Sequence, residues 1–349
     1  MALMWLLTTA DLRHRLLRFV VVAVLTAVVF VLLFLMTGLI EQFNQEPFLT
    51  VDAIGAEEWV VPEGVSGPFT ASSTLPASVA GAVDAPASDP VVVARGTLNL
   101  ADESTELLIF GHVVNGVGAL QPVEGRAIGG TGEVLLDRST GVEVGTIVDI
   151  GGAELEVVGL TEDTTMLAGI PLATMEISDA QALVFGTDAV ISAVLADGGV
   201  TGHPDGTAVI SADVAAEDAL GPLENAVSSV DLIRVLLWVM AAIIIGAVVY
   251  LSALDRARDF AVLKAVGATN RQLAGSLAVQ AVLVALVGVA LAAGLQVAIQ
   301  PIFPLTVRVP ASAFWIIPAV AVVVALLASI AGMRKVAGSD PAAAFAGPA

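Results

Sequence analysis

Four long apolar runs dominate the chain, and one long polar segment separates the first run from the other three. The first run, residues 19–40, holds 22 consecutive residues without a charge. At 1.5 Å per residue, a helix of this length crosses a hydrocarbon core of about 30 Å. The other runs are residues 235–254, 274–299 and 311–333. The pattern predicts a membrane protein with four transmembrane helices.

Basic residues flank these runs on one side of the predicted membrane. They precede the first run, occupy the loop between the second and third, and follow the fourth: Arg13, Arg15, Arg18, Arg256, Arg258, Lys264, Arg271, Arg334 and Lys335. Because Lys and Arg are enriched in cytoplasmic loops, we expect both termini to be cytoplasmic and the long polar segment to lie outside. The first run is too long for the apolar part of a typical cleaved signal peptide, so we expect it to be retained.

The polar segment, residues 41–222, predicts a large mixed α/β, strand-rich extracytoplasmic domain. Its first part, up to residue 90, is rich in Pro, Ser, Gly and Ala and favours loops, short strands and linkers. Short alternating or β-branched runs then predict strands at residues 91–94, 106–114, 133–136, 146–150, 153–159, 189–195 and 207–211.

Three local signals add detail to this domain. The pair Gly151-Gly152 between two alternating runs predicts a β-hairpin with a two-residue turn. Residues 178–184 and 212–230 favour helices instead of strands. The second of these leads without a strong break into the second apolar run, so we expect a stalk helix that starts at Pro222 or Leu223.

Composition narrows the possible functions. With 57% apolar and 14% charged residues, a wholly water-soluble enzyme is not expected. The net charge is −20, and residues 41–231 hold 30 Asp and Glu against three Arg, so a nucleic-acid partner is not expected. The chain has no Cys, and it lacks a phosphate-binding loop, a nucleophile elbow and an H-E-x-x-H helix. Its three His are isolated in sequence. We therefore predict no catalytic residue, no metal site and no bound cofactor in this chain.

Polar residues are sparse inside the predicted membrane helices, and two of them are glutamines in the third helix, residues 274–299. Polar side chains in lipid face a neighbouring helix or a cavity, and a transport path usually carries several ionisable groups, so packing between helices is the favoured role. Small residues four apart allow close helix approach. The predicted packing residues are Gln280, Gly288, Ala292, Gly294 and Gln296.

The cytoplasmic loop of residues 255–273 predicts a short amphipathic helix. Phe260, Leu263 and Val266 fall on one helical face. Gly267 is suited to the left-handed end of that helix, and Thr269 followed by Gln272 is the pattern of a capping box that starts the next helix. A loop that served only to fix the orientation of the chain in the membrane would need the arginines. It would not need a helix with a defined end and an apolar face exposed to water. The apolar face therefore indicates that this helix binds in a groove of a partner protein.

This loop, DRARDFAVLKAVGATNRQL, resembles that of the FtsX/MacB-like ABC transporter permeases, the type VII ABC transporter family. The shared pattern is a charged start, an apolar-Lys/Arg-Ala-apolar-Gly-Ala core at Leu263–Ala268, and a polar exit. The order of one helix, a large outer domain, three helices and a tail with Asp340-Pro341 also agrees. The resemblance implies an ATPase-coupling site made of Asp255, Arg256, Arg258, Asp259, Phe260, Leu263, Lys264, Val266, Gly267 and Ala268.

The resemblance further implies a permease subunit in the bacterial inner membrane that forms a homodimer, contacts membrane lipids and docks on a separate ABC ATPase, which binds ATP and Mg. ATP hydrolysis would then move the outer domain, a mechanism called mechanotransmission, for export, extraction or efflux of an amphiphilic substrate. An envelope adaptor or hydrolase is a further expected partner. One alternative is an FtsX-like regulator of an envelope enzyme or sensor. A less favoured alternative is an import permease for an amino acid or another small solute, because such a path needs intramembrane polar groups.

The expected organisation is an amphipathic cytoplasmic helix, four membrane helices and the segments between them. The corresponding ranges are 1–17 for the amphipathic helix, 18–40 for the first membrane helix, 41–222 for the outer domain, 223–254 for the stalk and second membrane helix, 255–273 for the coupling loop, 274–299 for the third helix, 300–310 for an outer loop, 311–333 for the fourth helix and 334–349 for the tail.

Overall fold

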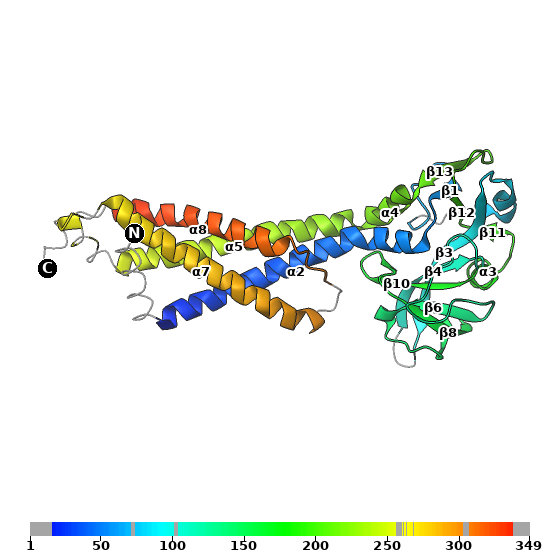
Figure 1. The fold of residues 1–349 in the computed structure, drawn as a ribbon, viewed down its shortest axis with the longest axis horizontal. Coiled ribbons are helices and arrows are strands. Elements are labelled where there is room, and N and C mark those ends of the chain that lie inside the picture. The colour runs from blue at the N-terminus through cyan, green and yellow to red at the C-terminus, as the bar shows by residue number, and fades with distance from the viewer. Residues whose placement is uncertain are drawn as a thin grey trace. The chain divides into compact units, whose positions relative to one another are not determined.

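The computed structural model describes residues 16–70, 74–100, 104–255, 260, 262, 264–267, 269–302 and 307–337. These residues form two compact units. The helical unit contains residues up to Glu41 and from Ser228 onwards, and the strand-rich unit is Gln42–Val227 (Figure 1). Nearly all of the predicted amphipathic helix at residues 1–17, and the tail motif at residues 340–344, lie outside the described residues.

Four helices are long and apolar enough to cross a membrane. They are α2 (Leu16–Ile54), α5 (Glu224–Asp255), α7 (Asn270–Ile299) and α8 (Ala313–Ala337). A short 3-10 turn, η4 (Gln300–Ile302), follows α7. With the strand-rich unit between α2 and α5, this arrangement confirms the predicted fold class.

The first helix is longer than the sequence predicts. It continues past Ile40 to Ile54, where loops and linkers were expected. Pro47 and several polar residues suggest a break, but Phe43, Val51 and Ile54 keep a helical spacing and are all at least 90% buried. Packing of this face therefore prevails over the local signal. The boundary between the two units falls within α2, at Glu41 and Gln42.

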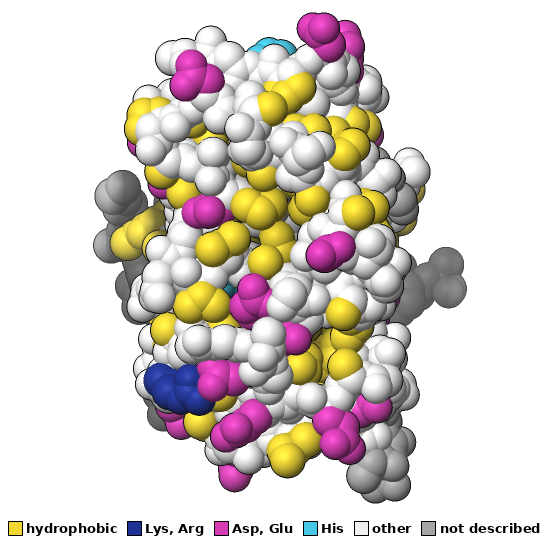
Figure 2. All heavy atoms as spheres, turned by 90° about the vertical axis from the view of Figure 1, so that its right-hand side faces the viewer, with side chains coloured by type: hydrophobic (Ala, Val, Ile, Leu, Met, Phe, Trp, Pro, Cys, Tyr) yellow, Lys and Arg dark blue, Asp and Glu magenta, His cyan; other side chains and the backbone are white. Residues whose placement is uncertain are grey.

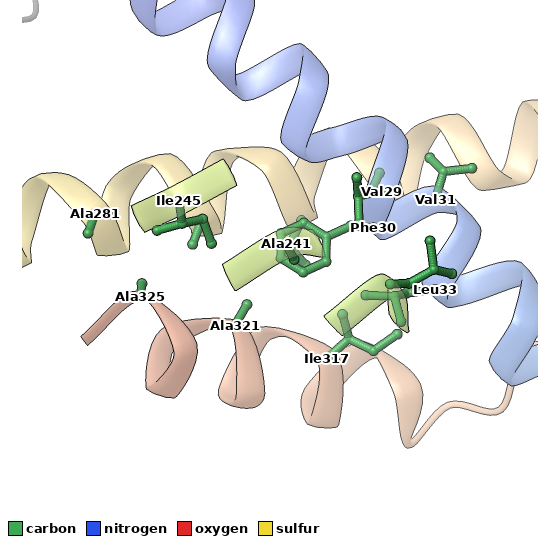
Figure 3. Packing of buried hydrophobic residues seen from close by; sticks show 14 of the residues in the cluster. Val29, Phe30, Val31, Leu33, Ala241, Ile245, Ala281, Ile317, Ala321 and Ala325 are labelled. Atoms are coloured by element: carbon green, nitrogen blue, oxygen red, sulfur yellow. The ribbon is translucent and has the colours of Figure 1, made fainter. Parts of the chain in front are cut away.

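Apolar side chains from all four helices form the core of the helical unit. Figure 3 shows Phe30 and Leu33 of α2 converging on Ala241 of α5 and Ala321 of α8. Phe30 also packs edge-on against Trp238, with ring centroids 6.1 Å apart. Alanines at the contact points let the helices approach closely, which is how helices associate in lipid. The outward faces are apolar as well, since Ile243 of α5 and Leu327 of α8 are more than 60% exposed.

The strand-rich unit contains thirteen strands among the described residues. They are β1 (Glu58–Pro62), β2 (Leu75–Pro76), β3 (Ala87–Asn99), β4 (Ser104–His112), β5 (Glu124–Gly125), β6 (Glu133–Asp137), β7 (Ile147–Ile150), β8 (Ala153–Thr161), β9 (Thr165–Met166), β10 (Ile170–Glu176), β11 (Val190–Ile191), β12 (Ala193–Asp197) and β13 (Thr207–Ser211). The helical elements are η1 (Ala77–Ala82), η2 (Arg138–Thr140), α3 (Ile177–Val184), α4 (Ala212–Leu220) and η3 (Gly221–Leu223).

Six of these strands close into a ring. The pairing order is β3-β4-β10-β6-β8-β7 and back to β3, with β4–β10 and β6–β8 parallel and the other pairs antiparallel. Alternate residues point inward and form an apolar core that includes Leu107, Ile109 and Met175. Helix α3 covers this core. Strands β12, β1 and β13 extend the sheet from β3, and Trp59 of β1 is fully buried in a second core.

The predicted hairpin is confirmed. Strands β7 and β8 pair with Ile150 opposite Ala153, which leaves only Gly151 and Gly152 in the turn. Both glycines have positive φ, 59° and 93°, as a type I′ turn requires. A side chain at either position would be strained, which explains the choice of glycine.

One central strand has no sequence prediction. Strand β10 pairs with β4 on one side and β6 on the other, but Pro171 near its start argues against a strand. The proline is tolerated because it lies opposite Thr165 of the short edge strand β9, before the ladder with β4 begins at Leu172. Strand β3 is also longer than predicted, because it runs from Ala87 to Asn99 instead of over residues 91–94. Two helix starts differ by only one or two residues. Helix α3 starts at Ile177 and is capped by the Glu176 side chain, and the stalk helix α5 starts at Glu224, just after Pro222 and Leu223.

Candidate functional site

The loop between α5 and α7 has the turn chemistry predicted for it. The Val266 N–H donates to the Val262 carbonyl at 3.1 Å, as in one turn of a helix. Gly267 ends this turn with φ of +105°, and its N–H donates to the Lys264 carbonyl at 3.0 Å. This left-handed end is the one expected of glycine.

A capping box then starts α7. The Gln272 N–H donates to Oγ1 of Thr269 at 3.4 Å, and the Thr269 N–H donates to Oε1 of Gln272 at 2.9 Å. Both bonds satisfy N–H groups that have no partner within the first turn of a helix. The start of α7 is therefore fixed by two residues of the loop itself.

The apolar residues of this loop divide into a buried and an exposed group. Phe260 is only 3% exposed and belongs to the apolar core that also holds Leu273 and Leu277 of α7. The expected exposure of Phe260 on the apolar face of the loop is therefore not found, whereas its role in coupling stays a prediction. Val266 is 82% exposed and Val262 is 51% exposed. They form the exposed apolar face of the loop.

Half of the predicted coupling residues lie outside the described part of the chain. These are Arg256, Arg258, Asp259, Leu263 and Ala268. Asp255 is the last residue of α5, and Lys264 is partly buried. A coupling role for the whole set stays a prediction.

Gln280 and Gln296, the two glutamines predicted to mediate packing, are both buried in α7. Nε2 of Gln280 donates to Oγ of Ser252 on α5 at 3.2 Å. Gln296 is 3% exposed, and its Oε1 has no partner among the described residues. The first glutamine thus joins two helices through a side-chain hydrogen bond, which is the arrangement that a packing role needs.

The small residues of α7 behave differently from one another. A Cβ on Gly288 would lie 3.0 Å from the side chain of Thr26, so α2 approaches this glycine closely. Ala292 is fully buried. Gly294 is exposed, and a Cβ there would meet nothing within 4 Å in the described chain. The close packing predicted for Gly294 is therefore absent from the described residues.

The strand-rich unit carries an acidic surface whose arginines are all paired. Arg95 contacts Glu106 at 2.6 Å, Arg126 contacts Glu133 at 2.6 Å, and Arg138 contacts Glu124 at 3.0 Å. Arg126 and the Gly129 N–H together lower the pKa of Glu133 to about 2. In Figure 2, acidic side chains are spread over the face shown, among apolar ones. Within the described residues no three His, Asp or Glu side chains gather as metal ligands would.

Three carboxylates of the strand-rich unit are buried, and sequence analysis singles out none of them: Glu46, Asp137 and Asp218. Asp218 on α4 accepts four hydrogen bonds from the loop of residues 66–70. Glu46 near the end of α2 accepts one from the Gly169 N–H at 2.7 Å. Asp218 lies in a helix with many polar positions, and Glu46 follows the apolar run in a stretch that suggests a loop. In the sequence, neither Asp218 nor Glu46 can be distinguished from an acidic residue on the surface, because the burial of each depends on a loop that folds against it.

Comparison with known proteins gives a consistent result over nearly the whole chain. The family described as FtsX-like permease C-terminal matches residues 232–341. The ABC transporter permease Rv2563 of Mycobacterium tuberculosis is 38% identical over 343 residues, which are 97% of this chain and 98% of that protein. The permease Rv0072 of the same species is 34% identical over 342 residues, with the same coverage. The permease Mb2592 of Mycobacterium bovis is also 38% identical over 343 residues, 97% of this chain and 98% of that protein.

One solved structure has a weak likeness. It is the extracellular domain of the noncanonic ABC-type transporter YknZ from Gram-positive bacteria, with a TM-score of 0.33 and 15% identity, and the match covers 45% of this chain and all of that one. A likeness at this level carries no argument about the fold.

Proposed function

The chain belongs to the FtsX-like family of ABC transporter permeases, and from this premise we propose that it couples ATP hydrolysis in a separate ATPase chain to movement of its strand-rich domain. The proposed outcome is export or extraction of an amphiphilic substrate from the outer side of a bacterial membrane. The ATPase chain would hold ATP and Mg, and a second copy of the permease would complete the transporter.

One observation carries this proposal. Helix α5 is one helix from Glu224 to Asp255, so the chain passes from the end of the strand-rich unit to the loop before α7 without leaving helical structure. A continuous hydrogen-bonded helix transmits a displacement along its axis with little loss. The basic residues around this loop favour the cytoplasmic side, where an ATPase works.

The exposed face of the loop supports docking there. Val262 and Val266 present apolar surface beside a turn that is fixed by Gly267 and by the capping box of Thr269. A rigid exposed apolar residue of this kind suits a groove in a partner protein. Import of a small polar solute is less well supported, because the described parts of the four helices contain few buried polar side chains.

The test is association with the ATPase. Replacement of Val266 by Asp places a charge at an 82% exposed position and should leave the fold intact. We expect co-purification with the ATPase to fall at least about tenfold, since a charge in a desolvated apolar contact costs several kcal/mol. Asp at Phe260 would be a poor test, because the side chain is buried.

A matched control uses the same change of chemistry elsewhere. Ile147 is 68% exposed on β7 of the strand-rich unit, and Ile147→Asp should leave ATPase binding unchanged. Equal binding by the Val266→Asp variant and the unmodified chain would show that the ATPase docks on another surface.

A further inference from the structure

Two loops of the strand-rich unit are fastened to the helices that connect it with the rest of the chain. Helix α2 enters the unit at Gln42, and α4 continues through η3 into α5, which leaves it at Val227. On each of these helices one carboxylate is buried. Asp218 of α4 is 7% exposed and Glu46 of α2 is 1% exposed. Because a buried carboxylate is costly unless it is hydrogen-bonded, both need firm partners.

Asp218 takes all of its hydrogen bonds from one short loop. Oδ1 accepts from the hydroxyls of Ser66 at 2.5 Å and Thr70 at 2.7 Å. Oδ2 accepts from the backbone N–H groups of Phe69 at 3.0 Å and Thr70 at 3.1 Å. Hydrogen bonds to an ionised acceptor are roughly twice as strong as neutral ones. Four of them on a five-residue loop hold residues 66–70 firmly to α4.

The loop also touches the core and separates two cavities. Phe69 packs edge-on against the fully buried Trp59, with ring centroids 5.4 Å apart. Thr70 lines both a cavity of about 330 Å³ and one of about 480 Å³. At Gly67 a Cβ would lie 2.5 Å from Cβ of Asp218, so the loop cannot sit this close with any other residue there. A displacement of α4 would therefore move Phe69 against Trp59 in the core and Thr70 in the lining of both cavities.

Helix α2 is fastened in a similar way to the loop of residues 163–169. Oε1 of Glu46 accepts from the Gly169 N–H at 2.7 Å, and the Thr50 hydroxyl donates to the Thr165 carbonyl at 2.6 Å. In this loop Leu167 and Ala168 have positive φ, 55° and 73°. Such strained residues persist only where surrounding contacts hold them. Here the contacts with α2 do so together with two hydrogen bonds from Thr164 to Oδ2 of Asp137 on β6.

We propose that Asp218 and Glu46 are the coupling residues through which α4–α5 and α2 move the strand-rich unit. Along a helix the backbone itself transmits a displacement. To a neighbouring loop, the displacement is transmitted only through contacts of the helix side chains. Loop 66–70 would follow α4 and loop 163–169 would follow α2, so movement of one helix against the other would deform the domain between the two loops. This inference rests on the proposed function, which supplies the displacement.

The experiment measures hydrogen–deuterium exchange of the two loops in the full chain in nanodiscs. The variants are Asp218→Asn and Glu46→Gln, which keep the shape of each side chain but remove its charge and one of its two acceptor oxygens. Matched controls are Glu217→Gln on α4 and Asp52→Asn on α2, both exposed acids on the same helices. In the chain alone, Asp218→Asn should raise exchange of the Phe69 and Thr70 amides at least about tenfold and leave Gly169 unchanged.

The second measurement adds the purified ATPase with ATP and Mg. In the unmodified complex we expect nucleotide to change exchange in both loops. Asp218→Asn should abolish this change in loop 66–70 only, and Glu46→Gln in loop 163–169 only, while the ATPase rate stays within about twofold of the unmodified complex. A merely structural role would not separate the two loops in this manner. If Asp218→Asn fails to fold, Thr70→Val removes one of the same bonds from the loop side, that of the Thr70 hydroxyl to Oδ1 of Asp218.

Two results would overturn the inference. One is a nucleotide-dependent change in loop 66–70 that survives Asp218→Asn or is lost equally in Glu217→Gln. The other is unchanged Phe69 and Thr70 exchange in the chain alone. By contrast, absence of ATPase binding by the unmodified chain would refute the proposed function, while the exchange of the chain alone still decides whether Asp218 holds the loop.

Discussion

The helical unit and the strand-rich unit bury apolar side chains against different surroundings. In the helical unit, alanines and phenylalanines meet inside, while Leu327 and Ile243 on the outside are just as apolar and more than 60% exposed. In the strand-rich unit, the core that holds both Leu135 and Trp59 is closed by acidic and polar surface. The difference shows that removal of apolar side chains from water drives folding of the strand-rich unit, whereas close packing between helices holds the helical unit together.

Polar groups follow the same division. In the helical unit, Gln280 donates to Ser252, a neutral bond that no change of pH can break. In the strand-rich unit, buried His112 is ionisable, and its Nδ1 contacts the Val113 carbonyl at 2.9 Å. The strand-rich unit is therefore the one that should respond to pH, and the helical unit the one that should respond to the size of small residues.

The largest expected contrast comes from the same substitution in both units. Leu135 of β6 is fully buried, and Leu135→Ala should cost about 2–5 kcal/mol of unfolding free energy because it removes apolar contacts and leaves a cavity. Leu327 of α8 is 62% exposed, and Leu327→Ala should change stability by less than about 0.5 kcal/mol, since lipid chains replace the lost contacts. Pulse proteolysis of the full chain measures both. Equal losses would mean that Leu327 is covered by protein.

A smaller contrast tests close fit within α7. Gly288→Leu should destabilise the helical unit by about 1–3 kcal/mol, because a Cβ there already lies 3.0 Å from Thr26. Gly294→Leu has open space around it and should be nearly neutral. The thermal midpoint of the helical unit in detergent measures both variants. A loss at Gly294 comparable to that at Gly288 would indicate a contact with a second copy of the chain.

The smallest expected effect concerns pH. Burial lowers the pKa of His112, and this outweighs the opposite effects of its bond to the Val113 carbonyl and of nearby Glu176 and Asp89. The unfolded chain then takes up a proton first as pH falls below about 6.5, so the stability of the strand-rich unit should decrease from there towards the lower pKa of the folded state.

The control for this effect is His112→Phe, which removes the ionisable ring and should flatten the dependence of the thermal midpoint between pH 7 and 5. Gln280→Leu in the helical unit should shift stability by about 0.6 kcal/mol or less, with no change across that pH range. An unmodified chain whose midpoint is constant between pH 7 and 5 would contradict the buried neutral state of His112.

The local elements of the candidate site follow from short-range signals. Gly267 and the pair Thr269 and Gln272 act within one helical turn, so their geometry is readable from sequence and is confirmed. The burial of Phe260 cannot be read from the sequence, because amphipathic spacing shows that one face is apolar but not which neighbouring segment covers it. The same holds for Gly294, whose spacing suits packing but whose surroundings in the described chain are open.

The sequence by itself determined the four apolar helices, the strand-rich insertion and the Gly151-Gly152 hairpin, because helix length, alternation and turn residues are local properties of the chain. Only the tertiary structure decided that α2 continues to Ile54, that six strands close into a ring and that Asp218 is buried against loop 66–70. These features depend on contacts between residues distant in sequence, whose packing and hydrogen bonds outweigh the local preference of Pro47 or of an acidic side chain.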